Sequence, residues 1–359
     1  MQIDKKENLK ISEEFVPFYD FLNYCRASFL SIIEYVDKNH LSDEPINYKS
    51  DKDRVIFEDV CKDKDAEQWL IDNGYKDVVF NFYFKHLFFS LLVDFCNYYN
   101  ASIDMAFNGN IYVAWALLRK PLQETLAYIE WLYVDKDELL KLMIESNDVK
   151  SYEIMNKKNK IKIKEHIDKI QNCKSTEILD IYDFRYSYDK ELTLNGILQA
   201  ANHLITTRPV LKTSPSGLNF IFQNGERIYR DTGFYYTAIS YVMTYTMDVI
   251  MKIFADIADL SEYTRAMNSL NLKLKELHTM SDQIDYKKAK ELLELDLIPV
   301  YCPVCGQSNS SDEMWIKFAY SHFECSKCHN KINTYQYLFD FEDITFVNEN
   351  HKDHNNGQV

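Results

Sequence analysis

Two Cys-x-x-Cys hooks near the end of the chain constrain its fold more than any other feature. Cys302 and Cys305 form the first hook, Cys325 and Cys328 form the second, and nineteen residues (306–324) separate them. Zinc is held by four thiolates in a tetrahedron, and each hook can present two sulfurs to one ion from a tight turn. The spacing falls within the structural zinc pattern. We therefore predict one structural Zn²⁺ on these four cysteines; the alternative is a pair of redox dithiols.

The sequence around the hooks predicts a small β module. The stretch "MWIKFAYSHFEC" has the pattern of a strand that delivers Cys325, and "NTYQYLFDFEDITFV" can close a small sheet. This segment resembles the zinc-ribbon class of modules, which we place at 298–348, with a flexible tail at 349–359. Because four cysteines fill the metal shell, His322 and His329 are expected to be bystanders and the metal to be structural rather than catalytic.

The scarcity of turn residues predicts a helical main domain. Only eight Gly and seven Pro occur in 359 residues, too few for the many turns of an all-β fold. Apolar residues recur at helical spacing over four stretches, 12–38, 76–99, 103–134 and 233–258. The charged stretch 39–66 is expected to be a loop. We therefore place a helical domain at 1–297.

One β-hairpin is expected inside this helical domain. Residues 217–231 alternate in type around Asn224 and Gly225, a dipeptide that accepts the positive φ angles of a tight hairpin turn. The predicted fold is thus mainly α, with one hairpin insertion and a small C-terminal β ribbon.

The charge of the chain limits its partners. A net charge of −14 excludes a protein that coats nucleic acid over its whole surface, because phosphate binding requires a basic footprint. Residues 301–359 carry four Lys, no Arg and eight acidic residues. Since a negative surface is repelled by phosphate, we expect the ribbon to contact protein, either a partner or a second copy, or the helical domain itself.

One segment of the chain is nevertheless basic. Lysines outnumber acids over 150–174, and such a run suits either an RNA backbone or the solvated face of a helix. The candidate RNA ligands are Lys157, Lys158, Lys160, Lys162 and Lys164. RNA binding through this segment is the alternative to a protein contact.

The sequence predicts neither export nor membrane insertion. Residues 1–15 carry charges where a signal peptide has an apolar core. The most apolar stretch, 78–99, is interrupted by residues that are costly in lipid, among them Lys85 and Asp94. We expect a buried helix there, a cytoplasmic protein and no membrane partner.

Three polar residues of the helical part are candidates for a catalytic site. Arg119 lies at the edge of the apolar stripe of 111–134, and Pro121 should kink this helix so that side chains converge. Glu124 and His203 complete the speculative set. The competing interpretation leaves Arg119 along the core edge with its head in water, Glu124 in a surface pair with a neighbouring lysine, and His203 at a helix end.

Two short segments carry a resemblance to a known group of proteins. They are "ALLRKPLQETLAYIEWL" (116–132) and "NHLITTR" (202–208), within an all-helical architecture. In these the chain resembles bacterial accessory-genome proteins that include HEPN-like toxin and antiphage families. The resemblance implies a regulatory or sensing component of antiphage defence or, alternatively, a HEPN-like ribonuclease or toxin. The ribonuclease signature of that family, an Arg followed by a His after four to six residues, does not occur here.

Other enzyme signatures are also missing from the sequence. It contains no Gly-x-x-x-x-Gly-Lys phosphate loop, no Gly-x-Ser-x-Gly elbow and no His-Glu-x-x-His helix. We therefore expect a protein without enzymatic activity, or a nuclease if it is an enzyme.

Overall fold

The computed structural model describes residues 11–62, 66–146, 148–171, 180–187, 193–203, 205, 225–280, 299–309, 317 and 322–340. Over these residues the chain is mainly helical, as its composition predicts. It divides into two compact units, Met1–Asp259 and Leu260–Val359. The long helix α11 (Glu262–Met280) is grouped with the second unit. The domain boundary expected at 297/298 stays a prediction.

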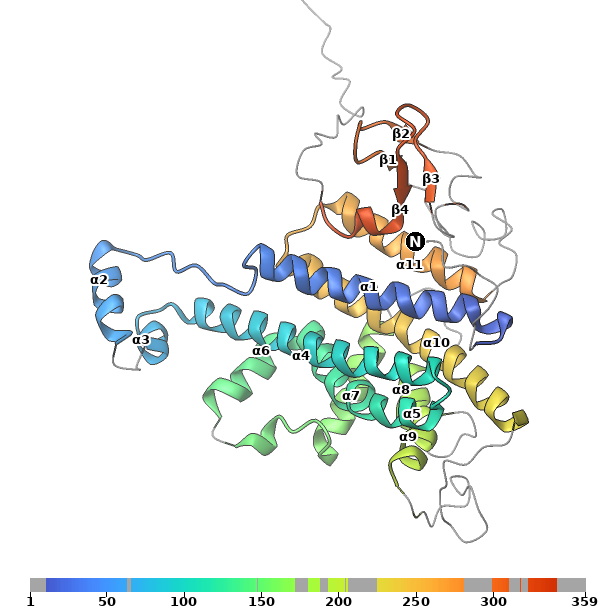
Figure 1. Ribbon diagram of the computed structural model, residues 1–359. Coiled ribbons are helices and arrows are strands. Elements are labelled where there is room, and N and C mark those ends of the chain that lie inside the picture. Colours follow the sequence, from blue (N-terminus) through green and yellow to red (C-terminus); the bar gives the residue numbers. More distant parts are fainter. Residues whose placement is uncertain are drawn as a thin grey trace, which may run out of the picture. The chain divides into compact units, whose positions relative to one another are not determined.

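The first unit is built from helices of very different lengths (Figure 1). Its helices of 20 or more residues are α1 (Val16–Lys38), α4 (Lys76–Phe107), α6 (Leu126–Glu145) and α10 (Gly225–Ile257). The shorter helices are α2 (Asp51–Val60), α3 (Ala66–Asp72), α5 (Ile111–Lys120), α7 (Lys157–Gln171), α8 (Ile181–Tyr186) and α9 (Leu194–Asn202). The 3₁₀ turns η1 (Glu13–Phe15) and η3 (Val149–Ser151) and the π-helix η2 (Pro121–Thr125) complete it.

The core of the first unit lies where α1, α4, α5, α6 and α10 meet. Large rings fill it, and the most deeply buried include Phe95, Tyr99, Trp115, Trp131 and Tyr235. Two tyrosine hydroxyls of this core have partners inside: Tyr99 donates to the carbonyl of Leu22 at 2.9 Å, and the hydroxyls of Tyr235 and Ser102 lie 2.7 Å apart. The indole N–H groups of Trp115 and Trp131 have no hydrogen-bond partner among the described residues. These rings thus serve core packing first, and only some of their polar groups are hydrogen-bonded.

Two helix boundaries follow from local chemistry. Gly74, which follows α3, has a φ of 80°, a left-handed conformation that favours glycine. Within α6, Asp135 has a non-helical φ of −156°, and its carboxylate accepts the N–H of Glu138 at 3.0 Å. Asp135 therefore caps a fresh helical start.

The charged stretch 39–66 is not a continuous loop. Ser50 accepts the N–H of Asp53 at 3.2 Å and caps α2. Phe57 of α2 packs its ring against Trp69 of α3, with centroids 5.5 Å apart. The many charged residues of this helix led to the prediction of a loop. The charged side chains face solvent, and a few aromatic rings pack against the other face of the helix.

The hairpin expected at 217–231 is wrong over its second half, and its first half lies outside the described residues. From Gly225 onward the chain belongs to α10. Tyr229 and Tyr236, about two helical turns apart, both pack against Phe15, with ring centroids 5.5 and 6.2 Å away. Contacts with a segment far away in the sequence thus outweigh the local preference of Asn-Gly for a turn.

The second unit joins α11 to two small hairpins. Strand β1 (Val300–Tyr301) pairs antiparallel with β2 (Ser308–Asn309), and β3 (His322–Glu324) pairs antiparallel with β4 (Lys331–Asn333). Each cysteine hook therefore lies in the turn of one hairpin. The strand that we expected over 333–347 is replaced at its start by the 3₁₀ turn η5 (Thr334–Tyr337), which Asn333 caps by accepting the N–H of Tyr335 at 3.1 Å. Its last part, 341–347, and the expected tail 349–359 lie outside the described residues.

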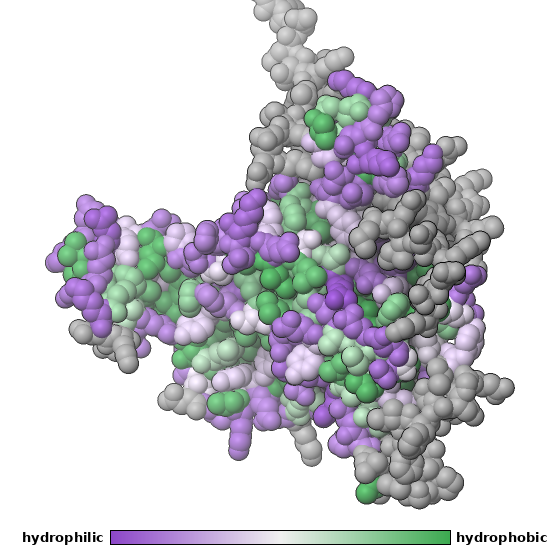
Figure 2. All heavy atoms as spheres, viewed as in Figure 1, coloured by the Kyte–Doolittle hydropathy of each residue, from purple (hydrophilic) through white to green (hydrophobic). Residues whose placement is uncertain are grey.

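Among the described residues, α4 and the 229–257 part of α10 are long and apolar enough to cross a membrane by length and composition. The apolar window of α10 is 72% buried and that of α4 only 28%. Lysine side chains cover rings on α4: the Nζ of Lys76 lies 4.7 Å from the Phe80 ring, and that of Lys136 lies 4.6 Å from the Phe84 ring. Figure 2 shows hydrophobic residues interspersed with hydrophilic ones in the region of α2, α3 and α4. The absence of a membrane partner stays a prediction.

Candidate metal centre

The four hook cysteines gather at the turns of the two hairpins. The Sγ atoms of Cys302 and Cys328 lie 3.6 Å apart, those of Cys305 and Cys325 lie 3.7 Å apart, and all four lie within 4.8 Å of one another. An ion with metal–sulfur distances of about 2.3 Å places tetrahedral sulfurs about 3.8 Å apart, whereas a disulfide needs about 2.05 Å. The arrangement fits one ion. Both short distances join different hooks, which disfavours two separate redox dithiols.

The backbone shapes the two hooks alike. The N–H of Gly306 donates to the carbonyl of Cys302 at 2.9 Å, and the N–H of His329 donates to that of Cys325 at 3.0 Å. The residue after each hook has a positive φ, 68° at Gly306 and 58° at His329. Glycine adopts this region freely, and histidine tolerates it better than most residues. His329 therefore closes a turn and is not part of the sulfur cluster.

Burial and backbone dipoles act differently on the two buried sulfurs. Cys302 and Cys325 are fully buried, whereas Cys305 is half-buried and Cys328 is exposed. Burial raises the pKa of the Cys302 thiol to about 12. Burial also opposes the charge of Cys325, but the backbone N–H groups of Cys328 and Lys327 outweigh it and lower its pKa to about 6. The fold thus favours a thiolate, the metal-binding form, at Cys325.

The donor set limits the kind of metal and its role. Four thiolates in a tetrahedron suit zinc or iron–sulfur chemistry, whereas calcium and magnesium prefer oxygen ligands. Four protein ligands also leave no open position for water or substrate. An ion on these residues therefore holds structure rather than activating a substrate.

The sulfur cluster lies on a hydrophobic core shared with α11. The buried apolar residues of this core are Met267, Leu270, Leu274, Val300, Phe323, Ile332 and Tyr337. The hydroxyl of Tyr263 on α11 donates to the carbonyl of Pro299 and accepts the N–H of Tyr301, both at 3.1 Å. The first three core residues come from α11, so this helix completes the module that holds the hooks.

Asp340, nearly eighty residues further along the chain, binds the N-terminal end of α11. One carboxylate oxygen of Asp340 accepts the N–H of Ser261 at 2.9 Å, and the other accepts the hydroxyls of Ser261 and Thr264 at 2.6 Å each. Burial acts against this charge, but the hydrogen bonds from Ser261 and Thr264 lower the pKa of Asp340. Asp340 thus serves as an N-terminal cap supplied from a distant segment.

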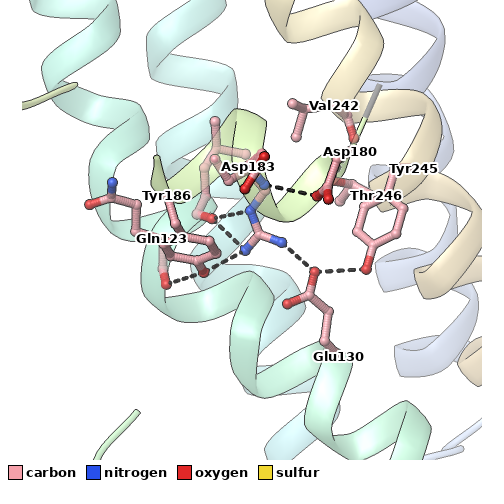
Figure 3. A network of polar contacts seen from close by, with 10 residues as sticks. Gln123, Glu130, Asp180, Asp183, Tyr186, Val242, Tyr245 and Thr246 are labelled. Atoms are coloured by element: carbon pink, nitrogen blue, oxygen red, sulfur yellow. Dashed lines mark hydrogen bonds and ion pairs between the residues drawn. The ribbon is translucent and has the colours of Figure 1, made fainter. Parts of the chain in front are cut away.

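A second polar cluster, which includes Glu130, Tyr186 and Tyr245, lies inside the first unit (Figure 3). Its central residue is Arg185 of α8. Arg185 forms an ion pair with Glu130 of α6, and both side chains are almost completely buried. The Oε1 atom of Glu130 also accepts the hydroxyl of Tyr245 at 2.9 Å, while its Oε2 atom has no hydrogen-bond partner among the described residues. Burial raises the pKa of Glu130 against the opposing charge of Arg185. Burial also disfavours the charge of Arg185, but Glu130 outweighs it and raises its pKa.

Arg185 also explains the π-helix η2. The N–H of Leu126 bonds to the carbonyl of Pro121, one residue further back than in an α-helix. The carbonyl of Leu122 is thereby released, and Arg185 donates to it from Nε at 2.9 Å and from Nη2 at 2.6 Å. The hydroxyl of Tyr186 donates to the next carbonyl at 2.8 Å. The kink expected at Pro121 is therefore a π-helix whose released carbonyls bind side chains of α8.

The speculative catalytic residues occupy three different elements. Arg119 is half-buried at the end of α5, Glu124 is half-buried in η2, and His203 is exposed at the C-cap of α9. The lysine beside Arg119 pairs with Asp94 of α4 at 2.8 Å rather than with Glu124. These positions do not test catalysis, so the three roles remain predictions.

Helix α7 carries the basic stretch. The Nζ of Lys162 pairs with the Oε1 of Glu138 at 2.6 Å. Lys160 and Lys164 are exposed, and the side chains of Lys157 and Lys158 lie outside the described residues. Lys162 is therefore paired with a carboxylate of the same fold, which reduces the positive charge available to bind phosphate.

Comparisons with protein-family models, with curated proteins and with solved structures find no match to this chain. The resemblance to HEPN-like proteins gains no support from them. The helical fold and the four-cysteine cluster are supported by the structure alone. Sequence reasoning found all four cysteines from their spacing but missed Arg185 and Glu130, which have no comparable local signal.

Proposed function

We propose that this is a cytoplasmic helical protein whose second unit is a zinc-stabilised module that docks a protein, either a partner or a second copy of the chain. The complete shell of four cysteines carries the proposal, because an ion so enclosed can stabilise a surface but cannot bind substrate. Zinc is the metal because its preferred sulfur spacing agrees with the distances between the hooks.

The surface of the module supports a protein contact. Residues 301–359 carry eight acidic residues against four lysines, a balance that repels phosphate. Val304, at the turn of the first hook, is 65% exposed, and Tyr335 in η5 is 40% exposed. Exposed apolar and aromatic side chains are the kind that protein interfaces bury.

The biological setting that we propose is regulation or sensing in bacterial antiphage defence. It rests on the resemblance of 116–132 and 202–208 alone. RNA binding by α7 makes a different prediction, since binding to phosphate weakens steeply with added salt.

The test compares the full-length protein with Cys325→Ser and with a matched control, Cys61→Ser, which changes an exposed cysteine outside the cluster. Metal content, self-association by sedimentation, and the proteins and nucleic acids retained from host extract are measured for each. We expect one zinc per chain, and either a dimer or a stoichiometric protein partner, in the wild type and in Cys61→Ser, with both lost in Cys325→Ser. Protein contacts that are identical in all three, or salt-sensitive retention of RNA alone, would overturn the proposal.

A further inference from the structure

Asn309 lies between the two hooks and uses both ends of its side chain. It belongs to β2 of the first hairpin and is 6% exposed. Its Oδ1 atom accepts the N–H and the hydroxyl of Ser326, each at 3.0 Å. Ser326 lies inside the second hook, so one side-chain oxygen of the first hairpin holds the backbone of the second.

The amide nitrogen of Asn309 binds the backbone of the first hairpin on both sides of the first hook. Its Nδ2 atom donates to the carbonyl of Gln307 at 2.8 Å and to that of Val300 at 3.3 Å, and it lies 3.9 Å from the Sγ of Cys325. The oxygen faces only donors and the nitrogen only acceptors, which fixes the orientation of the amide. Among the described residues, β1–β2 and β3–β4 form separate sheets. Asn309 thus provides a polar link where the two hairpins have no shared backbone pairing.

We propose that Asn309 is a positioning residue of the metal centre, which fixes the second hook against the first so that all four sulfurs reach one ion. Residues beyond the ligands orient them, and their loss typically weakens metal binding by about 10- to 100-fold. Here the link acts on the backbone of Ser326, between Cys325 and Cys328, and so on the two ligands of the second hook. The inference concerns the metal site alone and does not depend on what the module docks.

The test measures zinc affinity of the full-length chain by competition with a chromophoric chelator. We expect Asn309→Ala to bind zinc about 10- to 100-fold more weakly. Asn309→Asp keeps the shape but cannot donate, and it places a carboxylate against two carbonyls and a thiolate, so its loss should be at least as large. The matched control is Ser308→Ala, the exposed neighbour on the same strand, which should stay within about twofold. Equal affinities for Asn309→Ala and Ser308→Ala would overturn the proposal.

A milder variant covers the case in which Asn309→Ala fails to fold. Ser326→Ala removes one of the two bonds to Oδ1 and should weaken zinc binding by roughly 3- to 10-fold. If both residues act through one link, the double variant should bind no more weakly than Asn309→Ala. The thiolate charge-transfer spectrum of the Co²⁺-substituted protein should change in Asn309→Ala and not in Ser308→Ala. Fully additive losses, or an unchanged Co²⁺ spectrum in Asn309→Ala, would show that Asn309 does not position the ligands.

Discussion

Arg185 and Glu130 show what a single residue contributes to this fold. A buried ion pair gains little over apolar residues of similar size, because removing two charges from water is costly. Arg185, however, also binds the carbonyl that the π-helix releases at Leu122. It therefore satisfies a backbone group and a carboxylate together. The pair joins α6, α8 and, through Tyr245, α10.

Loss of Arg185 should be far more costly than loss of a surface arginine. Arg185→Ala leaves Glu130 buried without its charge partner and Leu122 without a donor, so the free energy of unfolding of the first unit should fall by about 3 to 5 kcal/mol. Arg230, whose side chain is 76% exposed beside Asp231, is the control, and Arg230→Ala should cost less than about 1 kcal/mol. Urea unfolding followed by circular dichroism measures both. Similar losses for the two variants would contradict the structural role of Arg185.

His166 should make the stability of the first unit depend on pH. Burial, with a smaller effect of Lys169, lowers its pKa from 6.5 to about 4. The unfolded chain therefore takes up a proton below about pH 6.5, while the folded chain does so only near pH 4. The stabilisation is complete above this window and is lost as the pH falls through it. We expect a loss of about 1 to 2 kcal/mol between pH 7 and pH 5, after allowing for solvent screening.

The matched variants separate His166 from other groups that titrate in this range. His166→Phe keeps a ring against Trp131, which packs at 5.6 Å, and should remove most of this pH dependence. His203→Gln changes an exposed histidine and should leave it intact. Urea titrations at pH 7 and pH 5 give the comparison. A pH dependence that survives in His166→Phe would assign the effect to other residues.

At the scale of elements, the sequence predicted those features whose cause is local. The two hooks depend on neighbours within a few residues, and the predicted helical stretches depend on spacing within a few helical turns. The region after Gly225 became helix instead of hairpin because Tyr229 and Tyr236 pack on Phe15, a contact that no local window contains. The ion pair of Arg185 and Glu130 was missed for the same reason, because the two residues are 55 positions apart in the sequence.

Helix α11 shows the same limit, because its packing partners are distant in the sequence. Periodicity indicates a helix but does not reveal which core that helix completes. Met267, Leu270 and Leu274 face the hairpins of the hooks, and Asp340 caps the helix. The helix therefore depends on the hairpins that carry the four cysteines rather than only on its own propensity.

Removal of the metal should release α11 together with the hairpins. Without the ion nothing joins the sulfurs of the two hooks, so the hairpins lose their structure. The core residues of α11 then lose the hairpin residues against which they pack. Hydrogen exchange with and without a zinc chelator measures this directly. Amides of 262–280 should lose protection in chelator, while those of α4 in the first unit should keep theirs. Continued protection of α11 would show that another part of the chain holds it.

At the scale of the whole molecule, the composition of the chain was sufficient to predict the fold class, and the spacing of the cysteines was sufficient to predict the four-cysteine cluster. The grouping of helices into compact units cannot be predicted in this way. The boundary that we placed at 297/298 from the sequence stays a prediction. Contacts in the structure group α11 with the two hairpins and divide the chain between Asp259 and Leu260, since compactness depends on which side chains share a core.

Two fragments distinguish these boundaries. A fragment of 260–359 keeps Ser261, the cap and all of α11, whereas 298–359 loses the three apolar residues that α11 contributes to the core. Burial of three such side chains contributes roughly 5 to 9 kcal/mol. Structural zinc sites bind with about 10 to 16 kcal/mol, and that energy is also folding energy.

The shorter fragment should therefore still bind zinc, but at least about a hundredfold more weakly, because part of the binding energy must replace the missing core. Chelator competition gives the two affinities, and circular dichroism shows whether the longer fragment gains helix when zinc is added. A variant of the longer fragment with Leu270→Ala and Leu274→Ala should approach the shorter one, since both changes empty the same core. Equal affinities for 260–359 and 298–359 would instead place α11 with the helical unit, because the hooks would then need nothing from it.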